Sequence, residues 1–162
     1  MYLACYLPCT GVVNIKAFKF HSQAIECVAM NNLFSSVWAE KFIEAWNRDS
    51  ELAGSLGKIG FSSVIAFGFL NEEGPRLCLQ IENGRAAGME SCAQLKPEWD
   101  VRADPDQWMD WMNNPPGLMA IGMAYTRRSL QFRAGDYVAM VKNPEMATPF
   151  VKCIEMMSRI SS

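Results

Sequence analysis

The residues that most often carry enzyme chemistry are sparse in this sequence. Its 162 residues include a single histidine, His21. A Ser/His/Asp or Cys/His catalytic site would have to recruit this residue, because both use an imidazole as the general base. His21 lies in an N-terminal stretch without sustained hydrophobic periodicity, so we interpret it as incidental to function. We predict no catalytic residue.

Metal and nucleotide sites are not indicated either. No CxxC pair occurs, and one histidine cannot complete a Cys/His zinc site of the usual spacing. The glycine-rich patterns that bind phosphates are missing, so we expect no metal and no cofactor. Without a secretory signal, we expect reduced, mostly buried thiols in a cytoplasm rather than disulfides. The six cysteines are Cys5, Cys9, Cys27, Cys78, Cys92 and Cys153.

The second half of the chain contains one acidic cluster and one basic pair. The cluster consists of Asp100, Asp104, Asp106 and Asp110. We interpret it as helix capping and solvated charge rather than an acid/base or metal site. The basic pair, Arg127 and Arg128, falls in an expected turn. It is either solvated there or in contact with an anionic head group at the mouth of a cavity.

The overall composition argues against nucleic acid as a partner. The formal net charge is -2 and no basic stripe is present. No apolar run reaches the length of a membrane span, and no signal peptide is recognised, so we expect a cytoplasmic protein without an integral membrane segment. Eleven methionines and five tryptophans suit a lipophilic pocket. The alternative is that they only fill a core.

The elements are expected to surround one long strand at residues 58–70, KIGFSSVIAFGFL. Side chains on a strand alternate between its faces. This strand therefore has a bulky apolar face and a face of small residues. The small face predicts a closely packed helix or one wall of a ligand cavity, and an ordinary central core strand is the alternative.

The flanking regions predict three helices and four more strands. A helix capped by Asn31 or Asn32 runs to about Arg48, with aromatic residues at every fourth position. Asn47, Asp49 and Ser50 provide a break and a possible cap for a second, short helix at residues 51–56. Asn83-Gly84 is a hairpin turn because both positions tolerate a positive φ. The last helix has an apolar side formed by Phe150, Val151, Ile154, Met157 and Ile160. The strands are expected at residues 76–82, 85–91, 99–103 and 129–133.

Several further helix starts are predicted in the second half. Residues 104–107 combine an Asp cap, a first-turn Pro and a Gln three residues after the cap. Residues 117–125 carry no charge and are expected to form a buried helix, with a strand as the alternative. Asp136 is expected to cap a turn, and Asn143-Pro144 and Thr148-Pro149 are two more cap-plus-proline starts.

We expect one folded domain, at residues 30–162. Residues 1–29 lack periodicity and contain half of the cysteines. Met30 directly precedes the first clear helix signal and could be the natural start. We therefore interpret residues 1–29 as an N-terminal extension outside the native domain.

From about residue 31 to residue 160, the order of elements resembles the sterol carrier protein type 2 family, specifically its small stand-alone bacterial members. The matching stretches are FIEAWNRDSEL, KIGFSSVIAFGF, RLCLQIENGRAAGMES, WDVRADPDQWMDWMNNPP and SLQFRAGDYVAMVKNP. The resemblance implies an α+β fold, with a five-stranded, mostly antiparallel sheet covered on one face by helices. It also implies a hydrophobic tunnel for sterols, fatty acids, fatty acyl-CoA or phospholipid, and no invariant catalytic residue.

The resemblance further implies which residues bind the ligand. The chain departs from the family in its bulky tryptophans, which could fill the tunnel and leave room only for a ligand smaller than a sterol. On this pattern the ligand-binding residues are Phe34, Trp38, Phe42, Trp108, Met109, Met112, Leu118, Met119, Ile121, Met123, Phe150 and Ile154.

Three functional hypotheses follow. The first is a non-enzymatic carrier of a small hydrophobic ligand. The second is an enzyme, or an accessory subunit of one, acting on a hydrophobic metabolite in a catabolic pathway. Asp100, Arg102, Tyr125 or Tyr137 would then supply polar groups in the pocket. The third is an interaction protein whose exposed apolar surface forms a homodimer.

Overall fold

The computed structural model describes residues 32–89 and 92–160. The expected extension at residues 1–29, the candidate cap Asn31 and the end of the strand expected at 85–91 therefore lie outside the described residues. No helix of the described part is long and apolar enough to cross a membrane.

A five-stranded sheet forms the base of the fold, in the order β3-β2-β1-β4-β5. The central strand β1 pairs antiparallel with β2 and parallel with β4, and the two outer pairs, β2–β3 and β4–β5, are antiparallel. This confirms the expected α+β class with a mostly antiparallel sheet. The strands are β1 (Ser63–Phe69), β2 (Leu77–Glu82), β3 (Arg85–Met89), β4 (Trp99–Ala103) and β5 (Leu130–Ala134).

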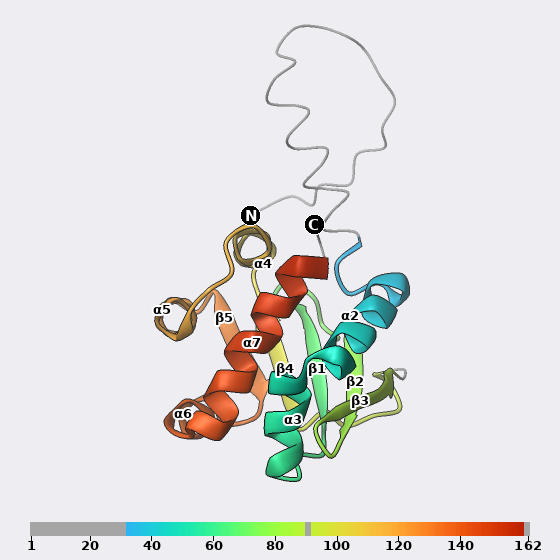
Figure 1. Cartoon of the computed structure of the whole chain (residues 1–162). Helices are drawn as coiled ribbons and strands as arrows, with labels where there is room; N and C mark the ends of the chain where they lie inside the picture. The colour runs from blue at the N-terminus through green and yellow to red at the C-terminus, as the bar shows by residue number, and fades with distance from the viewer. Residues whose placement is uncertain (1–31, 90–91, 161–162) are drawn as a thin grey trace, which may run out of the picture.

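Helices cover one face of this sheet. Figure 1 shows α2, α3 and α7 lying across that face, with α5 and α6 to one side near β5. The bulky residues of β1 and the alternating apolar residues of β2 point toward the helices and are largely buried. The helices are α2 (Ser36–Arg48), α3 (Ser50–Lys58), α4 (Pro105–Asn113), α5 (Leu118–Thr126), α6 (Tyr137–Lys142) and α7 (Pro144–Ile160).

Tryptophans attach two helices to the sheet. Trp46 of α2 donates its indole N–H to the carbonyl of Gly84 at 2.9 Å, and Trp108 of α4 donates to Gly68 at 3.0 Å. Each indole thereby buries a large apolar surface while its polar atom is satisfied. The apolar stripe predicted for α2 is confirmed by its buried Trp38 and Phe42.

The expected start of the first helix was wrong. The N-cap of α2 is Ser35, whose hydroxyl accepts a hydrogen bond from the backbone N–H of Trp38, and not Asn32. Phe34 precedes the helix in a left-handed conformation, with φ of 66°. This conformation is unusual for a residue with a side chain, and the ring of Phe34 is buried in the core.

The long strand expected at residues 58–70 is also shorter than predicted. Helix α3 extends to Lys58, and Gly60 then adopts a φ of 63°, so the chain becomes a strand only at Ser63. The small face of β1 lies on the side away from the helices, which corrects the expectation of a closely packed helix. A Cβ at Gly68 would lie 3.2 Å from the side chain of Arg102. The space over this face of β1 is therefore filled by an arginine.

The hairpin, a helix cap within residues 47–50 and the helix after Asp104 were predicted correctly, and the structure shows that the cap is Asp49. Asn83 and Gly84 have φ values of 47° and 80°. However, the side chain of Asp104 makes no cap hydrogen bond. Gln107 instead accepts a hydrogen bond from Ser129 at 2.8 Å. The helix start is therefore right, whereas the predicted reciprocal capping is not formed.

Two helical expectations in the second half need correction. Helix α5 forms where a helix was favoured, but Ile121 and Ala124 are its only buried residues, so it is not a buried helix. Thr148-Pro149 does not start a helix, because α7 begins at Pro144 and continues through Pro149.

Candidate ligand site

An apolar cavity of about 50 Å³ lies between the sheet and α7. Side chains from β1, β4 and β5 form its floor, and α7 contributes most of its roof. None of the lining residues carries a charge. They are Trp46, Leu56, Phe61, Ile65, Phe67, Trp99, Val101, Phe132, Met140, Met146, Pro149, Phe150 and Cys153.

The chemistry of the lining is that of a hydrocarbon environment. Cys153 supplies the one thiol of the wall, and its burial raises the pKa of this thiol above the ordinary value. The thiol therefore stays protonated at neutral pH and is a poor nucleophile. The cavity can accept an apolar group, and no lining residue is equipped for acid/base chemistry at neutral pH.

The cavity is small. A cavity of about 150 Å³ accommodates benzene, so about 50 Å³ is too small for a sterol or even an aromatic ring. The described residues do not show the hydrophobic tunnel that the family resemblance implies. Fully buried side chains, among them Trp108, Trp111 and Phe42, fill the space between helices and sheet.

The structure brings together four of the predicted ligand-binding residues. Phe34 lies at the centre of an aromatic cluster, with ring centroids 5.5 Å from Trp38 and 5.3 Å from Trp108. Phe42 stacks on Trp38 at 5.0 Å. These rings pack on the same face of the sheet as the cavity, but they do not line it.

The other eight predicted residues are distributed over three environments. Ile121 and Ile154 are buried, and Met109 and Met112 are half-buried. Phe150 is the one member of the predicted set that lines the cavity. Leu118, Met119 and Met123 on α5 are 39%, 81% and 48% exposed. Contact between these residues and a ligand remains a prediction.

Sequence reasoning missed most of the cavity wall. A signal existed for Phe61, Ile65 and Phe67, because they occupy the bulky alternating positions of the central strand segment. Met140 and Met146 carry no comparable signal. Their positions depend on how α6 and α7 pack over β5, which local sequence does not determine.

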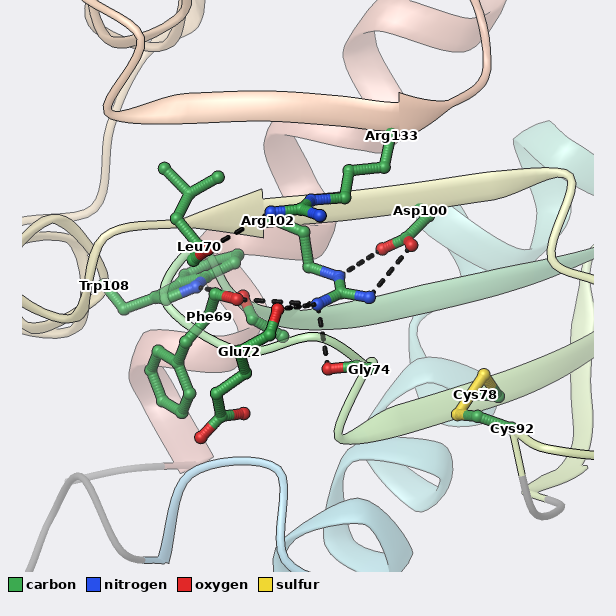
Figure 2. Close-up of polar contacts among 11 residues, drawn as sticks. Phe69, Leu70, Glu72, Gly74, Cys78, Cys92, Asp100, Arg102, Trp108 and Arg133 are labelled. Atoms are coloured by element: carbon green, nitrogen blue, oxygen red, sulfur yellow. Dashed lines mark hydrogen bonds and ion pairs between the residues drawn. A yellow bond between two sulfur atoms is a disulfide. The ribbon is translucent and has the colours of Figure 1, made fainter.

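Two of the polar residues considered for an enzyme lie outside the cavity. Arg102 is 1% exposed and sits on the sheet face opposite the helices. Its guanidinium forms a bidentate pair with Asp100, with Nη2 3.0 Å from Oδ2, and donates to the carbonyl of Gly74 at 2.8 Å (Figure 2). This network fixes the β1–β2 loop to the sheet.

The two tyrosines of that hypothesis lie near β5. Tyr125 and Tyr137 stack with ring centroids 4.0 Å apart, and both contact Phe132, one of the cavity-lining residues. Burial and the neighbouring Tyr125 raise the pKa of Tyr137. Both phenols therefore belong to an aromatic stack behind the cavity wall.

The acidic cluster does not form a metal site. Asp104, Asp106 and Asp110 line a shallow groove at the beginning of α4, together with Ser129. Within residues 32–89 and 92–160, no group of three or more potential metal ligands is found.

Comparison of the structure with solved structures identifies a similar fold. A crystal structure of sterol carrier protein 2 superposes with a TM-score of 0.55 at 17% sequence identity, covering 76% of this chain and 98% of the other. The fold resembles that of sterol carrier protein 2. A conserved hypothetical protein of Thermus thermophilus, described as a possible sterol carrier protein, gives a TM-score of 0.54 at 17% identity and covers 78% of this chain and 90% of its own.

No family model matches the sequence, and no curated protein matches it. The likeness to sterol carrier protein 2 is therefore one of fold. At 17% identity, this likeness does not identify a ligand.

Proposed function

We propose that this protein is a non-enzymatic carrier that binds a hydrophobic ligand between its sheet and α7. The observation that supports this most directly is a cavity whose wall carries no charged side chain, located within a fold like that of sterol carrier protein 2. Removal of apolar surface from water contributes roughly 25 cal/mol per Å², so such a cavity can hold a ligand with little specific polar chemistry.

Ligand uptake requires the cavity to expand. The roof includes Met140 and Met146, whose flexible side chains can move aside without a change of backbone. Pro149 interrupts the hydrogen bonding of α7 at the same place. A fatty acid, an acyl-CoA chain or a small aromatic compound would need less expansion than a sterol, so we favour these over sterol-like ligands.

The predicted ligand contacts define how far the cavity would extend. Phe150 already lines the cavity and would touch the ligand from its present position. Buried Ile154 and Trp108 would reach it only if the cavity grows along α7 toward α4. Exposed Met119 and Met123 would require a movement of α5.

An enzymatic role has less support. Asp100 and Arg102 form an ion pair with each other on the opposite face of the sheet, away from the cavity.

The expected cytoplasmic location remains a prediction. The Cys78–Cys92 disulfide argues against it, because disulfides are typical of oxidising compartments.

Native mass spectrometry of freshly purified protein, followed by organic extraction, is the first test. A retained lipid or aromatic compound would support the carrier and name the ligand class. A ligand-free mass, with no uptake from fatty acids, acyl-CoA, sterols and small aromatics, would contradict it.

A cavity-filling variant then locates the site. Met146→Trp places a large ring in the cavity from a half-buried position and should weaken binding of a fluorescent fatty acid about tenfold or more. Val37→Trp is the matched control, because Val37 is exposed on α2 and does not line the cavity. Equal affinity of the two variants would exclude this cavity as the binding site.

A further inference from the structure

Helix α5 presents an apolar surface without a partner among the described residues. Leu118, Met119 and Met123 are its exposed large hydrophobic residues, and they belong to a helix without a single charged side chain. Its opposite side packs inward through Ile121 and Ala124. A helix with one buried side and one exposed apolar side requires an explanation, because large exposed apolar patches mark interaction sites.

A pair of cations lies directly at the end of this surface. Arg127 and Arg128 follow α5, are both exposed, and form no ion pair with any other described residue. Arg127 lines a shallow groove together with Met119 and Met123. Met119, Met123 and Arg127 therefore share one surface, and Arg128 is the next residue along the chain.

We propose that α5 and the Arg127-Arg128 pair dock this protein on an anionic lipid bilayer. Apolar side chains inserted at the head-group boundary, combined with nearby arginines, are the two contributions that hold peripheral proteins on negatively charged membranes. The proposal rests on the carrier function, because it gives a carrier a place to exchange its ligand.

The position of α5 relative to the cavity supports this occupant. Tyr125 of α5 contacts Phe132 of β5, and Phe132 is part of the cavity wall. Helix α5, which carries the docking surface, is therefore connected to the cavity wall through this aromatic contact. A ligand that leaves the bilayer near α5 would have a short path to the binding site.

A second copy of this chain fits the same surface less well. In a symmetric dimer through α5, each patch would face its own copy, so four arginines would meet with no acidic side chain in the patch to compensate them. Stable protein interfaces use about 20–30 residues on each side, far more than this patch offers. The acidic side chains Asp104, Asp106 and Asp110 line a separate groove at the beginning of α4.

The test is vesicle co-sedimentation of the full chain. Vesicles of phosphatidylcholine alone are compared with vesicles that also contain phosphatidylglycerol. Met119→Gln/Met123→Gln removes the apolar contact, and Arg127→Gln/Arg128→Asn removes the charge. Asn is chosen at position 128 because Arg128 has a φ of 64°, which Asn tolerates. The controls are Val37→Gln for the first variant and Lys41→Gln/Lys96→Gln for the second, all at exposed positions.

The wild type should bind the anionic vesicles more tightly than the neutral ones. The arginine variant should lose about fivefold in affinity per arginine, and the methionine variant about tenfold, with both controls at the wild-type level. Binding by either variant equal to its control would overturn the proposal. So would a wild-type dimer in solution that the methionine variant dissociates.

The same samples are assayed for uptake of a fluorescent fatty acid, which separates the two proposals. Uptake without vesicle binding overturns only the docking surface. Vesicle binding without uptake supports docking and overturns the carrier function on which its purpose depends.

Discussion

Arg102 is the most completely buried charge of the described residues, and its guanidinium satisfies several partners at once. Besides the pair with Asp100, it lies within hydrogen-bonding distance of the carbonyls of Phe69, Glu72 and Gly74. Arg133 adds a hydrogen bond from the outer strand to the carbonyl of Leu70 at 3.2 Å (Figure 2). The loop between β1 and β2 is thus held to the sheet by side chains from β4 and β5.

Arg102→Ala should therefore lower the free energy of unfolding by about 3–5 kcal/mol, because it leaves Asp100 buried without its partner. Chemical denaturation measures this change. Arg85→Ala, at an exposed position of β3, is the matched control and should change stability by no more than about 0.5 kcal/mol. A loss below about 1 kcal/mol for Arg102→Ala would show that the network is dispensable.

At this scale, the sequence predicts the residues whose role is local. The cap at Asp49 and the turn at Asn83-Gly84 depend on a few neighbouring residues, and both form as expected. The hydrogen bonds from Arg102 to the β1–β2 loop join residues about 30 positions apart in the sequence. No spacing pattern encodes such a contact, so it could not be predicted.

Among the elements, β2 and the segment after β3 are joined covalently. Cys78 lies in β2 and Cys92 follows β3, with a sequence separation of 14 residues. The expectation of reduced thiols was therefore wrong for this pair. The hairpin itself was predictable, but a disulfide depends on how far the chain continues beyond β3 before it turns back.

Removal of this disulfide in Cys78→Ala/Cys92→Ala should cost about 2–3 kcal/mol of stability, because the closed loop restricts the unfolded chain. Thermal unfolding with and without a reductant measures the effect. Reductant should lower the midpoint of the wild type and leave that of the variant unchanged. If reductant also lowers the unfolding midpoint of the variant, the effect comes from other cysteines and not from this disulfide.

The prediction that residues 117–125 form a buried helix was wrong for a simple physical reason. A run of residues without charge is typical of a buried segment, and this helix instead exposes Met119 and Met123. Hydrophobicity alone predicted the element type but not its surroundings. The shortened central strand has a similar cause, since the alternating pattern continues through Ile59 and Phe61 although Gly60 ends α3 there.

At the scale of the whole molecule, the alkylation rate of Cys153 indicates whether the cavity opens. Its thiol is buried in the cavity wall, and burial raises its pKa, so the folded protein holds no reactive thiolate at this position at neutral pH. Alkylation of Cys153 should therefore be slow and limited by opening, and a bound ligand should slow it further.

Time-resolved alkylation with iodoacetamide, read peptide by peptide in a mass spectrometer, tests this expectation. The rate should rise with pH toward the ordinary thiol pKa, because only the open state ionises there. Denatured protein gives the reference rate. Labelling of the folded protein at the denatured rate, with or without a fatty acid, would contradict a closed cavity.

The family resemblance predicted the layer arrangement correctly, from the five-stranded sheet to the helices on one face. The size of the cavity could not be predicted in this way. It depends on how Trp46, Phe67, Phe132 and other large side chains interlock, and a difference of a few ångströms in that packing separates a tunnel from a small void.

Pro149 in the interior of α7 has a consequence for how a ligand could enter. Proline has no backbone N–H to donate to the carbonyl of Glu145, and its ring crowds that carbonyl. The part of α7 before Pro149 is therefore joined to the rest of the helix by a weakened junction, directly over the cavity. A movement confined to this first part would admit a guest while the sheet and the C-terminal turns of α7 stay in place. The rate of ligand exchange would then depend on this local movement rather than on unfolding of the whole chain.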